Sequence, residues 1–237
     1  MLGWLSLIGV GTVILWNWRK SEYRFIVYFV LGFVRCFGKL WHGCRMEKPH
    51  IPFPESGPAI LMMNHTASSD PLFVIAMCPR MVAFLYAQEF GTSVSFIKWC
   101  LDNTFCIPVE RDKPEIRAAR KALSRLQEGR IVGIFPEANL RGAGGTKLRP
   151  ARCGVAWLAL RSRAPVHPIY ITGGPQSPDL LDAWAKPSKK QPRLRIGPAV
   201  DLTQFYDRPI RRPLLEEVTQ YLMDHLAALA LKGKANP

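Results

Sequence analysis

From residue 52 onward, short apolar runs alternate with longer segments of helical periodicity, and this alternation constrains the fold more than any other feature. The run Ala59–Met63 ends in polar residues, which is typical of a buried strand, and the run 131–135 is a second strand candidate that Pro136 ends. The clearest helix is 114–128, which starts with proline and is followed by Gly129. Strands that alternate with helices predict an α/β fold, with a single mixed β-sheet flanked by helices.

Local signals predict further elements. Asp70 before Pro71 indicates a helix N-cap followed by proline at the first helical position, with the helix continuing through Ala76. Pro168 interrupts a strand candidate and favours an edge strand or an irregular start, because proline lacks a backbone N–H. The apolar face of helix 114–128 is expected to consist of Ile116, Ala119, Leu123 and Leu126. The remaining candidates are strands at 81–86 and 166–171, helices at 153–160 and 214–231, and a loop with one short helix at 173–192.

The N-terminal part of the chain carries two apolar runs, and we expect residues 1–45 to form membrane-associated helices. Residues 1–18 contain no charged side chain, and a helix needs about 20 apolar residues to cross a hydrocarbon core, so this run is a borderline span. Residues 25–34 are too few to span. They predict a helix in the membrane interface, with flanking basic side chains that snorkel (Arg24, Arg35 and Lys39).

The basic residues behind the first run predict the orientation. Arg19, Lys20, Arg24, Arg35 and Lys39 all follow it, which places the rest of the chain on the cytoplasmic side. A signal peptide is the alternative for the first run, but no basic segment precedes it and no small-residue cleavage site precedes Asn17. Both runs could also be ordinary buried helices.

The net charge of +14, from 32 Lys and Arg against 18 Asp and Glu, predicts an anionic partner. Nucleic acid, an anionic membrane and phosphorylated small molecules all fit this charge. No nucleic-acid-binding motif is present, and the apolar runs favour membrane lipids, so we expect no nucleic acid. The six cysteines lack Cys-x-x-Cys and Cys/His metal spacing, which indicates reduced thiols and no metal site.

The block from Asn64 to Asp70 carries the chemistry, because it lies between a predicted strand and a predicted helix. Loops at strand ends hold the reacting groups of many α/β proteins. If the loop folds back, Asp70 can bond to His65, fix the tautomer of the imidazole and stabilise its protonated form. Such a pair can take a proton from an alcohol. Each residue also has a structural interpretation, Asp70 as a helix cap and His65 as a satisfied histidine at a strand end.

Three more blocks lie at strand ends or beside helices. Glu137 follows a strand, and Asn139, Arg141 and a glycine-rich loop come after it, a combination that suits a phosphorylated ligand. Arg111 lies among acidic residues before helix 114–128, where it could equally form a salt-bridged surface turn. The segment 165–170 is apolar and fits the core of the protein.

In this order and at these spacings, the blocks resemble the lysophosphatidic acid acyltransferase family (1-acylglycerol-3-phosphate O-acyltransferases) within the glycerolipid acyltransferases. The resemblance covers about residues 50–200, and its most specific parts are the Asn-His-x4-Asp and Phe-Pro-Glu blocks. It implies an acyltransferase domain at 46–237. This domain would move an acyl group from acyl-CoA or acyl-carrier protein directly to the hydroxyl of a lysophospholipid, such as lysophosphatidic acid, with no other cofactor.

The resemblance also implies roles for single residues. His65 would be the base and Asp70 its orienting partner. Arg111 matches the arginine of the second block, which helps to bind the acceptor phosphate in the family. Glu137 matches the glutamate of the third block. The expected substrate-binding residues are Asn64, Arg111, Glu137, Asn139 and Arg141.

The sequence departs from the family pattern in the third block, which runs Phe-Pro-Glu-Ala-Asn-Leu-Arg instead of Phe-Pro-Glu-Gly-Thr-Arg-Ser, and just before the second. Leu140 stands where the third block has its phosphate-binding arginine, and Arg141 follows one residue later. Phe105 stands where a glycine is usual before the second block. Either Arg141 contacts the same phosphate, or the acceptor is another lysolipid that carries less charge.

Two alternatives to this enzyme class are disfavoured. A metal site built from His65, Asp70 and Glu137 would contain a single histidine. A non-catalytic basic membrane-binding module would explain the charge and the N-terminus, but it would not require a paired His and Asp.

Overall fold

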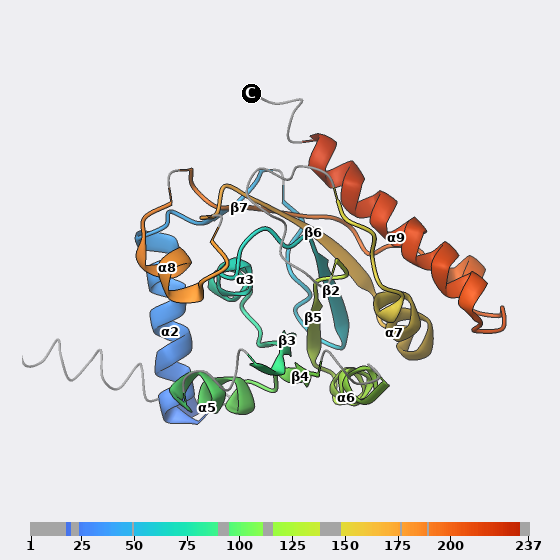
Figure 1. Ribbon diagram of the computed structural model, residues 1–237, viewed down its shortest axis with the longest axis horizontal. Helices are drawn as coiled ribbons and strands as arrows, with labels where there is room; N and C mark the ends of the chain where they lie inside the picture. Colours follow the sequence, from blue (N-terminus) through green and yellow to red (C-terminus); the bar gives the residue numbers. More distant parts are fainter. Residues whose placement is uncertain are drawn as a thin grey trace, which may run out of the picture.

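The computed structural model describes residues 18–19, 24–48, 50–89, 95–110, 116–137, 148–175, 177–188 and 190–232. Within these residues, seven strands form one sheet in the order β1-β7-β6-β2-β5-β3-β4, with helices on both faces (Figure 1). All neighbouring strands are parallel except β6 and β7, which are antiparallel. The predicted α/β class with a single mixed sheet is therefore confirmed. The strands are β1 (Arg45–Met46), β2 (Ala59–Met63), β3 (Val82–Ala87), β4 (Ile107–Val109), β5 (Ile131–Ile134), β6 (Val166–Thr172) and β7 (Arg193–Ile196).

The central strand β2 is buried at all five positions. It lies between β5 and β6, and both of its faces are covered, which explains why its sequence is apolar throughout instead of alternating. Its bounds agree with the predicted strand. Because β2, β5 and β6 are parallel, their carboxyl ends meet at one edge of the sheet.

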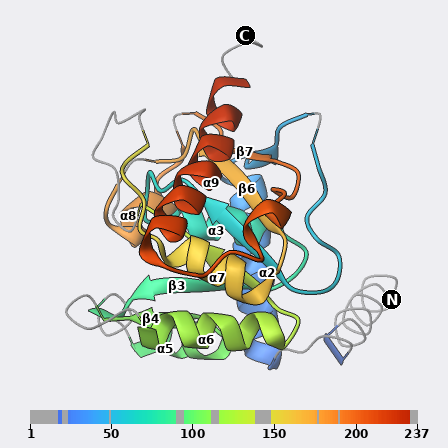
Figure 2. The same cartoon turned by 90° about the vertical axis from the view of Figure 1, so that its right-hand side faces the viewer.

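One face of the sheet is covered by α6 (Ile116–Gln127), α7 (Gly154–Ser162) and α9 (Arg212–Lys232). Figure 2 looks onto this layer, in which α9 crosses over α7 and α6 lies beside β3 and β4. Ile60 and Met62 of β2 face this layer. The buried side of α6 consists of Ala118, Ala122 and Leu126, whereas Ile116 is exposed, so the predicted apolar face of this helix is wrong by part of a turn.

The other face is covered by α3 (Asp70–Met77), with α2 (Phe25–Leu40) and α8 (Leu180–Ala185) packed beside it (Figure 1). Helix α2 approaches α3 closely at Gly38, where an added Cβ would lie 2.7 Å from the Cβ of Ala76. The Arg35 guanidinium donates to the backbone carbonyls of Ile75, Cys78 and Pro79. It therefore binds carbonyl groups at and just beyond the end of α3, which is a site where positive charge is favourable.

The structure corrects the prediction for residues 25–34. The helix is longer and runs to Leu40, with Val27, Leu31, Val34 and Gly38 buried along one side. Arg35 does not snorkel, because it binds the end of α3. In the described part of the chain, no helix combines the length and apolar character that crossing a bilayer requires. The predicted borderline span at 1–18 lies, apart from its last residue, outside the described residues.

The structure also corrects the interpretation of Pro168. Strand β6 is not at an edge, because it lies between β2 and β7. The carbonyl of Pro168 accepts from the N–H of Gly197, just past the end of β7. Proline cannot donate back to the Gly197 carbonyl, and Nδ1 of His167 lies 3.3 Å from that oxygen instead. The His167 side chain thus contacts the Gly197 carbonyl, which the backbone N–H of a residue other than proline would contact at position 168.

Some elements were not predicted. Strand β4 lies just before Arg111, for which a salt-bridged surface turn was the alternative, and β1 and β7 are short, although β7 alternates between charged and apolar residues. Helix α5 (Ser95–Asn103) and the short 3-10 helix η1 (Thr203–Phe205) were also missed. The predicted strand at 81–86 is shifted by one residue, and the helices at 153–160 and 214–231 are present with small shifts at their ends.

Candidate active site

The carboxyl edge of the parallel strands brings the predicted blocks together. Asn64 and His65 follow β2, and Phe135 to Glu137 follow β5, its immediate neighbour. The start of α3 returns the chain to the same edge and carries Asp70. Open α/β sheets bind ligands at this edge.

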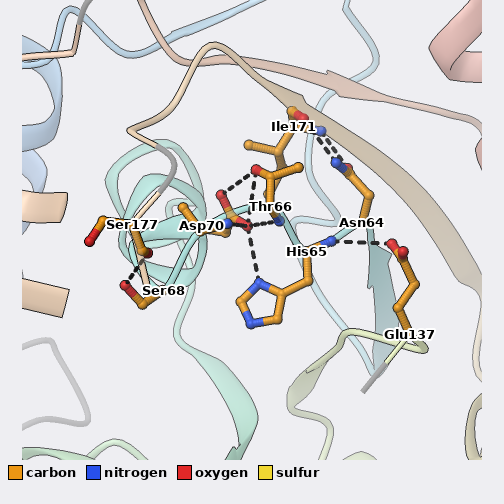
Figure 3. A network of polar contacts seen from close by, with 9 residues as sticks. Asn64, His65, Thr66, Ser68, Asp70, Glu137, Ile171 and Ser177 are labelled. Carbon is orange, nitrogen blue, oxygen red and sulfur yellow. Dashed lines mark hydrogen bonds and ion pairs between the residues drawn. The ribbon is translucent and has the colours of Figure 1, made fainter. Parts of the chain in front are cut away.

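His65 and Asp70 form a hydrogen-bonded pair. Nδ1 of His65 lies 3.0 Å from Oδ2 of Asp70 (Figure 3). A carboxylate accepts, so Nδ1 carries the proton and Nε2 is left with its lone pair. Asp70 is fully buried and the His65 side chain is 18% exposed. Among the described residues, no group bonds to Nε2, which points away from Asp70. This arrangement suits a base.

The carboxylate of Asp70 also shapes the loop. Its Oδ2 accepts from the backbone N–H groups of Thr66 at 2.6 Å and Ala67 at 2.8 Å. Asp70 is the first residue of α3 and Ser69 is the N-cap, so the prediction of Asp70 as N-cap is wrong by one residue. Its side chain faces back to the loop and not along the helix. The carboxylate therefore bonds to His65 and to the loop that holds it.

Asn64 connects two strands. Its Nδ2 donates to the carbonyl of Ile171 at 2.9 Å, and its Oδ1 accepts from the N–H of Ile171 at 2.7 Å. The side chain is fully buried. Its predicted contact with substrate stays a prediction, and its observed contacts join β2 and β6 directly before His65.

Glu137 connects the two loops of the site. Its Oε1 accepts from the N–H of His65 at 3.4 Å, and its Oε2 accepts from the N–H of Arg149 at 2.9 Å (Figure 3 shows the first contact). The residue is buried. The carbonyl of Pro136 accepts from the backbone N–H of Arg152, so a second bond joins the segment around Glu137 to the segment around Arg149. Glu137 therefore lies beside the base, with its carboxylate directed at backbone groups.

Phe135 covers one face of the His65 ring. The two ring centroids are 4.1 Å apart and the planes meet at 26°. This phenylalanine is the first residue of the Phe-Pro-Glu block, and no role was predicted for it. An apolar residue directly after a buried strand, two positions before the glutamate, was the available signal.

The other histidines have different surroundings. Burial lowers the pKa of His42, whose ring bonds to Ser188 and to the Trp184 carbonyl. Burial also lowers the pKa of His167, which bonds to the Gly197 carbonyl. His225 bonds to a carbonyl of its own helix. Among the residues that the structure describes, only His65 pairs with a carboxylate.

Three predicted substrate-binding residues, Arg111, Asn139 and Arg141, lie outside the described residues. In the part of the chain that is described, no three His, Cys, Asp or Glu side chains converge as metal ligands would. All six cysteines are free thiols.

A cavity of about 1100 Å³ lies beside the site and does not include His65. The end of β6, α8 and the segment before β7 form its walls, with Lys186, Lys190 and Arg193 among the lining residues. One lining residue touches the catalytic loop, because the carbonyl of Ser177 accepts from the N–H and the hydroxyl of Ser68. This cavity was not predicted.

Residues 48–172 match the acyltransferase family, and this stretch is more than half of the chain. The chain belongs to the acyltransferase family. Among curated proteins it is similar to the 1-acyl-sn-glycerol-3-phosphate acyltransferase of Borreliella burgdorferi, with 30% identity over 122 residues. That alignment covers 50% of this chain and 47% of the relative, so the chain spans about half the length of this protein.

A second relative and a solved structure extend the comparison. The 1-acyl-sn-glycerol-3-phosphate acyltransferase of Bacillus subtilis is 22% identical over 165 residues, which cover 68% of this chain and 76% of that protein. The crystal structure of the 1-acyl-sn-glycerophosphate (LPA) acyltransferase PlsC from Thermotoga maritima superimposes with a TM-score of 0.66 at 19% identity. The match covers 96% of this chain and 90% of that chain, and it shows a shared fold.

Proposed function

We propose that this chain is a 1-acylglycerol-3-phosphate O-acyltransferase of phospholipid biosynthesis. It moves a fatty acyl group from acyl-CoA or acyl-carrier protein to the free hydroxyl of lysophosphatidic acid, and phosphatidic acid is the product. One observation carries the proposal. A histidine whose Nε2 bonds to none of the described residues is held by a buried aspartate at the carboxyl edge of the sheet, in a chain of the acyltransferase family.

The proposed reaction needs one base and no acyl-enzyme. Nε2 of His65 takes the proton of the acceptor hydroxyl as the oxygen attacks the thioester carbonyl carbon. The new C–O bond forms, the C–S bond breaks, and the thiolate receives the proton from the imidazolium. Asp70 stabilises the imidazolium that forms between these steps, because its carboxylate bonds to Nδ1–H.

The acceptor is proposed to lie beside Glu137, next to the loop that carries His65. Glu137 orients the His65 backbone, so its part in substrate binding is to shape the site. Arg111, Asn139 and Arg141 are proposed to contact the acceptor, and guanidinium groups suit a phosphate monoester because they bind it with two parallel hydrogen bonds. Another lysolipid remains the second candidate acceptor, since Leu140 replaces the family arginine.

We further propose that the protein works at a membrane, with the catalytic domain on the cytoplasmic side. Support comes from α2, on which Phe25, Ile26, Phe29 and Phe33 are exposed although they are large and apolar. Exposed apolar patches of this kind mark interaction sites.

The direct test is acyl transfer with the purified full chain in mixed micelles. Radiolabelled palmitoyl-CoA and palmitoyl-acyl-carrier protein serve as donors, and lysophosphatidic acid, lysophosphatidylcholine and lysophosphatidylglycerol serve as acceptors. The proposal expects labelled phosphatidic acid from at least one donor. Transfer to a different lysolipid alone would correct the acceptor. If the folded protein transfers no label from either donor to any acceptor, the proposed acyltransferase activity is refuted.

A further inference from the structure

Three aromatic rings form a row across three neighbouring strands and end at the base. Phe84 of β3 stacks on Phe135 with centroids 6.1 Å apart and an angle of 18° between the planes. Phe135, directly after β5, stacks in turn on His65, which follows β2. The strand order β2-β5-β3 places these three residues side by side.

The strand register explains the row. Gly133 of β5 pairs with Leu61 of β2 and with Phe84 of β3. Side chains two positions apart lie on the same face of a strand, so Phe135 and His65 share the face of Gly133 and Leu61. Phe84 lies in the same core cluster as Leu61 and Phe135. All three rings therefore belong to the face that α3 covers.

Gly133 provides the space that Phe84 needs. A Cβ added to this glycine would lie 2.6 Å from Cδ1 and Cε1 of the Phe84 ring and 2.8 Å from the Val82 side chain. Such a contact is closer than packed atoms allow. The Phe84 ring therefore occupies the volume that a side chain at position 133 would fill, and that volume lies directly before Phe135.

The row supplies a constraint on His65 that Asp70 cannot supply. A single hydrogen bond at Nδ1 fixes one edge of the imidazole and still lets the ring swing about that bond. A ring stacked on the flat face of the imidazole restricts this rotation. Phe135 can hold the imidazole in place only if its own ring is held in place, and the Phe84 ring stacks on it.

We propose that Phe84, seated in the space left by Gly133, is a positioning residue that holds the base His65 through Phe135. The inference rests on the proposed acyl transfer. It predicts that loss of the Phe84 ring affects turnover more than binding, since Phe84 is buried in the core. Displacing a catalytic group by about 1 Å can cost about 100-fold in rate, so a partial loosening is expected to cost about ten-fold.

The test compares Phe84→Leu with Phe205→Leu. Both phenylalanines are 4% exposed, and Phe205 packs on Tyr221 at the opposite face of the sheet, away from His65. We expect both variants to lose a similar amount of thermal stability. Only Phe84→Leu should lower kcat, by about ten-fold, with the KM for both substrates nearly unchanged.

The glycine gives a second, independent variant. Gly133→Ala should push Phe84 toward Phe135 and lower kcat in the same way. In the double variant Gly133→Ala with Phe84→Leu, the smaller side chain relieves the overlap with residue 84, and the contact with Val82 is the same as in Gly133→Ala, so the loss should not exceed that of the worse single variant. Multiplied losses in the double variant, or equal kcat in Phe84→Leu and Phe205→Leu, would overturn the proposal.

A readout without turnover separates this inference from the proposed function. The ring protons of His65 should show an upfield NMR shift from the Phe135 ring, assigned by comparison with His65→Ala. Phe84→Leu should reduce that shift and Phe205→Leu should leave it unchanged. An unchanged shift in Phe84→Leu contradicts the positioning role even in a protein that proves to have no transfer activity.

Discussion

Oδ2 of Asp70 lies 3.0 Å from Nδ1 of His65, and the same oxygen accepts the two backbone N–H groups that follow the histidine. The loop conformation and the tautomer of the imidazole thus depend on one buried atom. This explains why a short segment between a strand and a helix can hold a base without a longer supporting loop. It also means that a change at Asp70 must alter both the shape of the loop and the chemistry of His65.

His65→Ala should abolish acyl transfer and leave the fold intact. A general base contributes about 10² to 10⁴ in rate, whereas the fold rests on the buried sheet and its two helical layers. The rate in micelles is measured together with the thermal melt. His225→Ala is the matched control, since that ring bonds within α9. Near-normal turnover in His65→Ala would exclude the proposed mechanism.

Asp70→Asn should lose most activity and also some stability. The amide keeps one oxygen, but it cannot stabilise the imidazolium. If its NH₂ group turns toward the loop, this donor faces the backbone N–H groups of Thr66 and Ala67, which are donors as well. Hydrogen bonds to charged groups are worth about 1.5–3 kcal/mol each, so the melting temperature should fall measurably. Asp201→Asn, at an exposed turn, serves as control. A variant with wild-type kcat and a wild-type melt would contradict both roles of Asp70.

Arg141→Ala should raise the KM for lysophosphatidic acid at least several-fold and leave the KM for the thioester donor nearly unchanged. The reason is the loss of charged hydrogen bonds, typically worth about 1.5–3 kcal/mol. Gly142, Gly144 and Gly145 follow Arg141, and glycine permits the backbone conformations that would let Arg141 take the role of the family arginine. Initial rates at limiting acceptor decide the point. Equal rates for variant and wild type would exclude this contact, and preference for a zwitterionic lysolipid would favour the second acceptor.

Phe29→Ser with Phe33→Ser should weaken binding to membranes. Both side chains are exposed on α2, and burying large apolar side chains in a lipid interface is favourable by about 1.5–3 kcal/mol each. Flotation with vesicles that contain anionic lipid measures the bound fraction, and alkaline carbonate should not fully release the wild-type chain. Leu181→Ser with Leu231→Ser is the matched control, as both leucines are exposed on other helices. Equal flotation of the two double variants, or a wild-type chain that stays monodisperse without detergent, would argue against this membrane surface.

The thiols should differ sharply in reactivity. Burial raises the pKa of the Cys44 thiol to about 12 and that of Cys78 to about 11, so both stay protonated at pH 8 and form thiolate only in strong base. The thiolate is the reactive form. Iodoacetamide at pH 8 should label the exposed Cys36 and spare Cys44 and Cys78 until the protein is denatured. Peptide mass mapping gives the answer, and early labelling of Cys44 would mean that the packing of α2 is looser than described.

The local part of this structure follows from the sequence alone. An apolar run that ends in polar residues was enough to place β2 with its observed bounds, and the spacing of His65 and Asp70 was enough to predict that the two side chains pair. These features are written in contiguous residues, because strand burial and loop chemistry are read over a few positions. Fine boundaries were less secure, and Asp70 proved to be the first helical residue instead of the cap.

What only the tertiary structure decided depends on residues far apart in the chain. Periodicity does not say which strand lies beside which, so Pro168 suggested an edge until β7 was seen to pair beyond it. Nor does periodicity say that Phe84, packed against Gly133, stacks on Phe135 and that Phe135 stacks on His65, since these contacts require the order β2-β5-β3 and its register. The direction of Asp70 and the buried side of α2 were settled in the same way, by the neighbours that packing supplies.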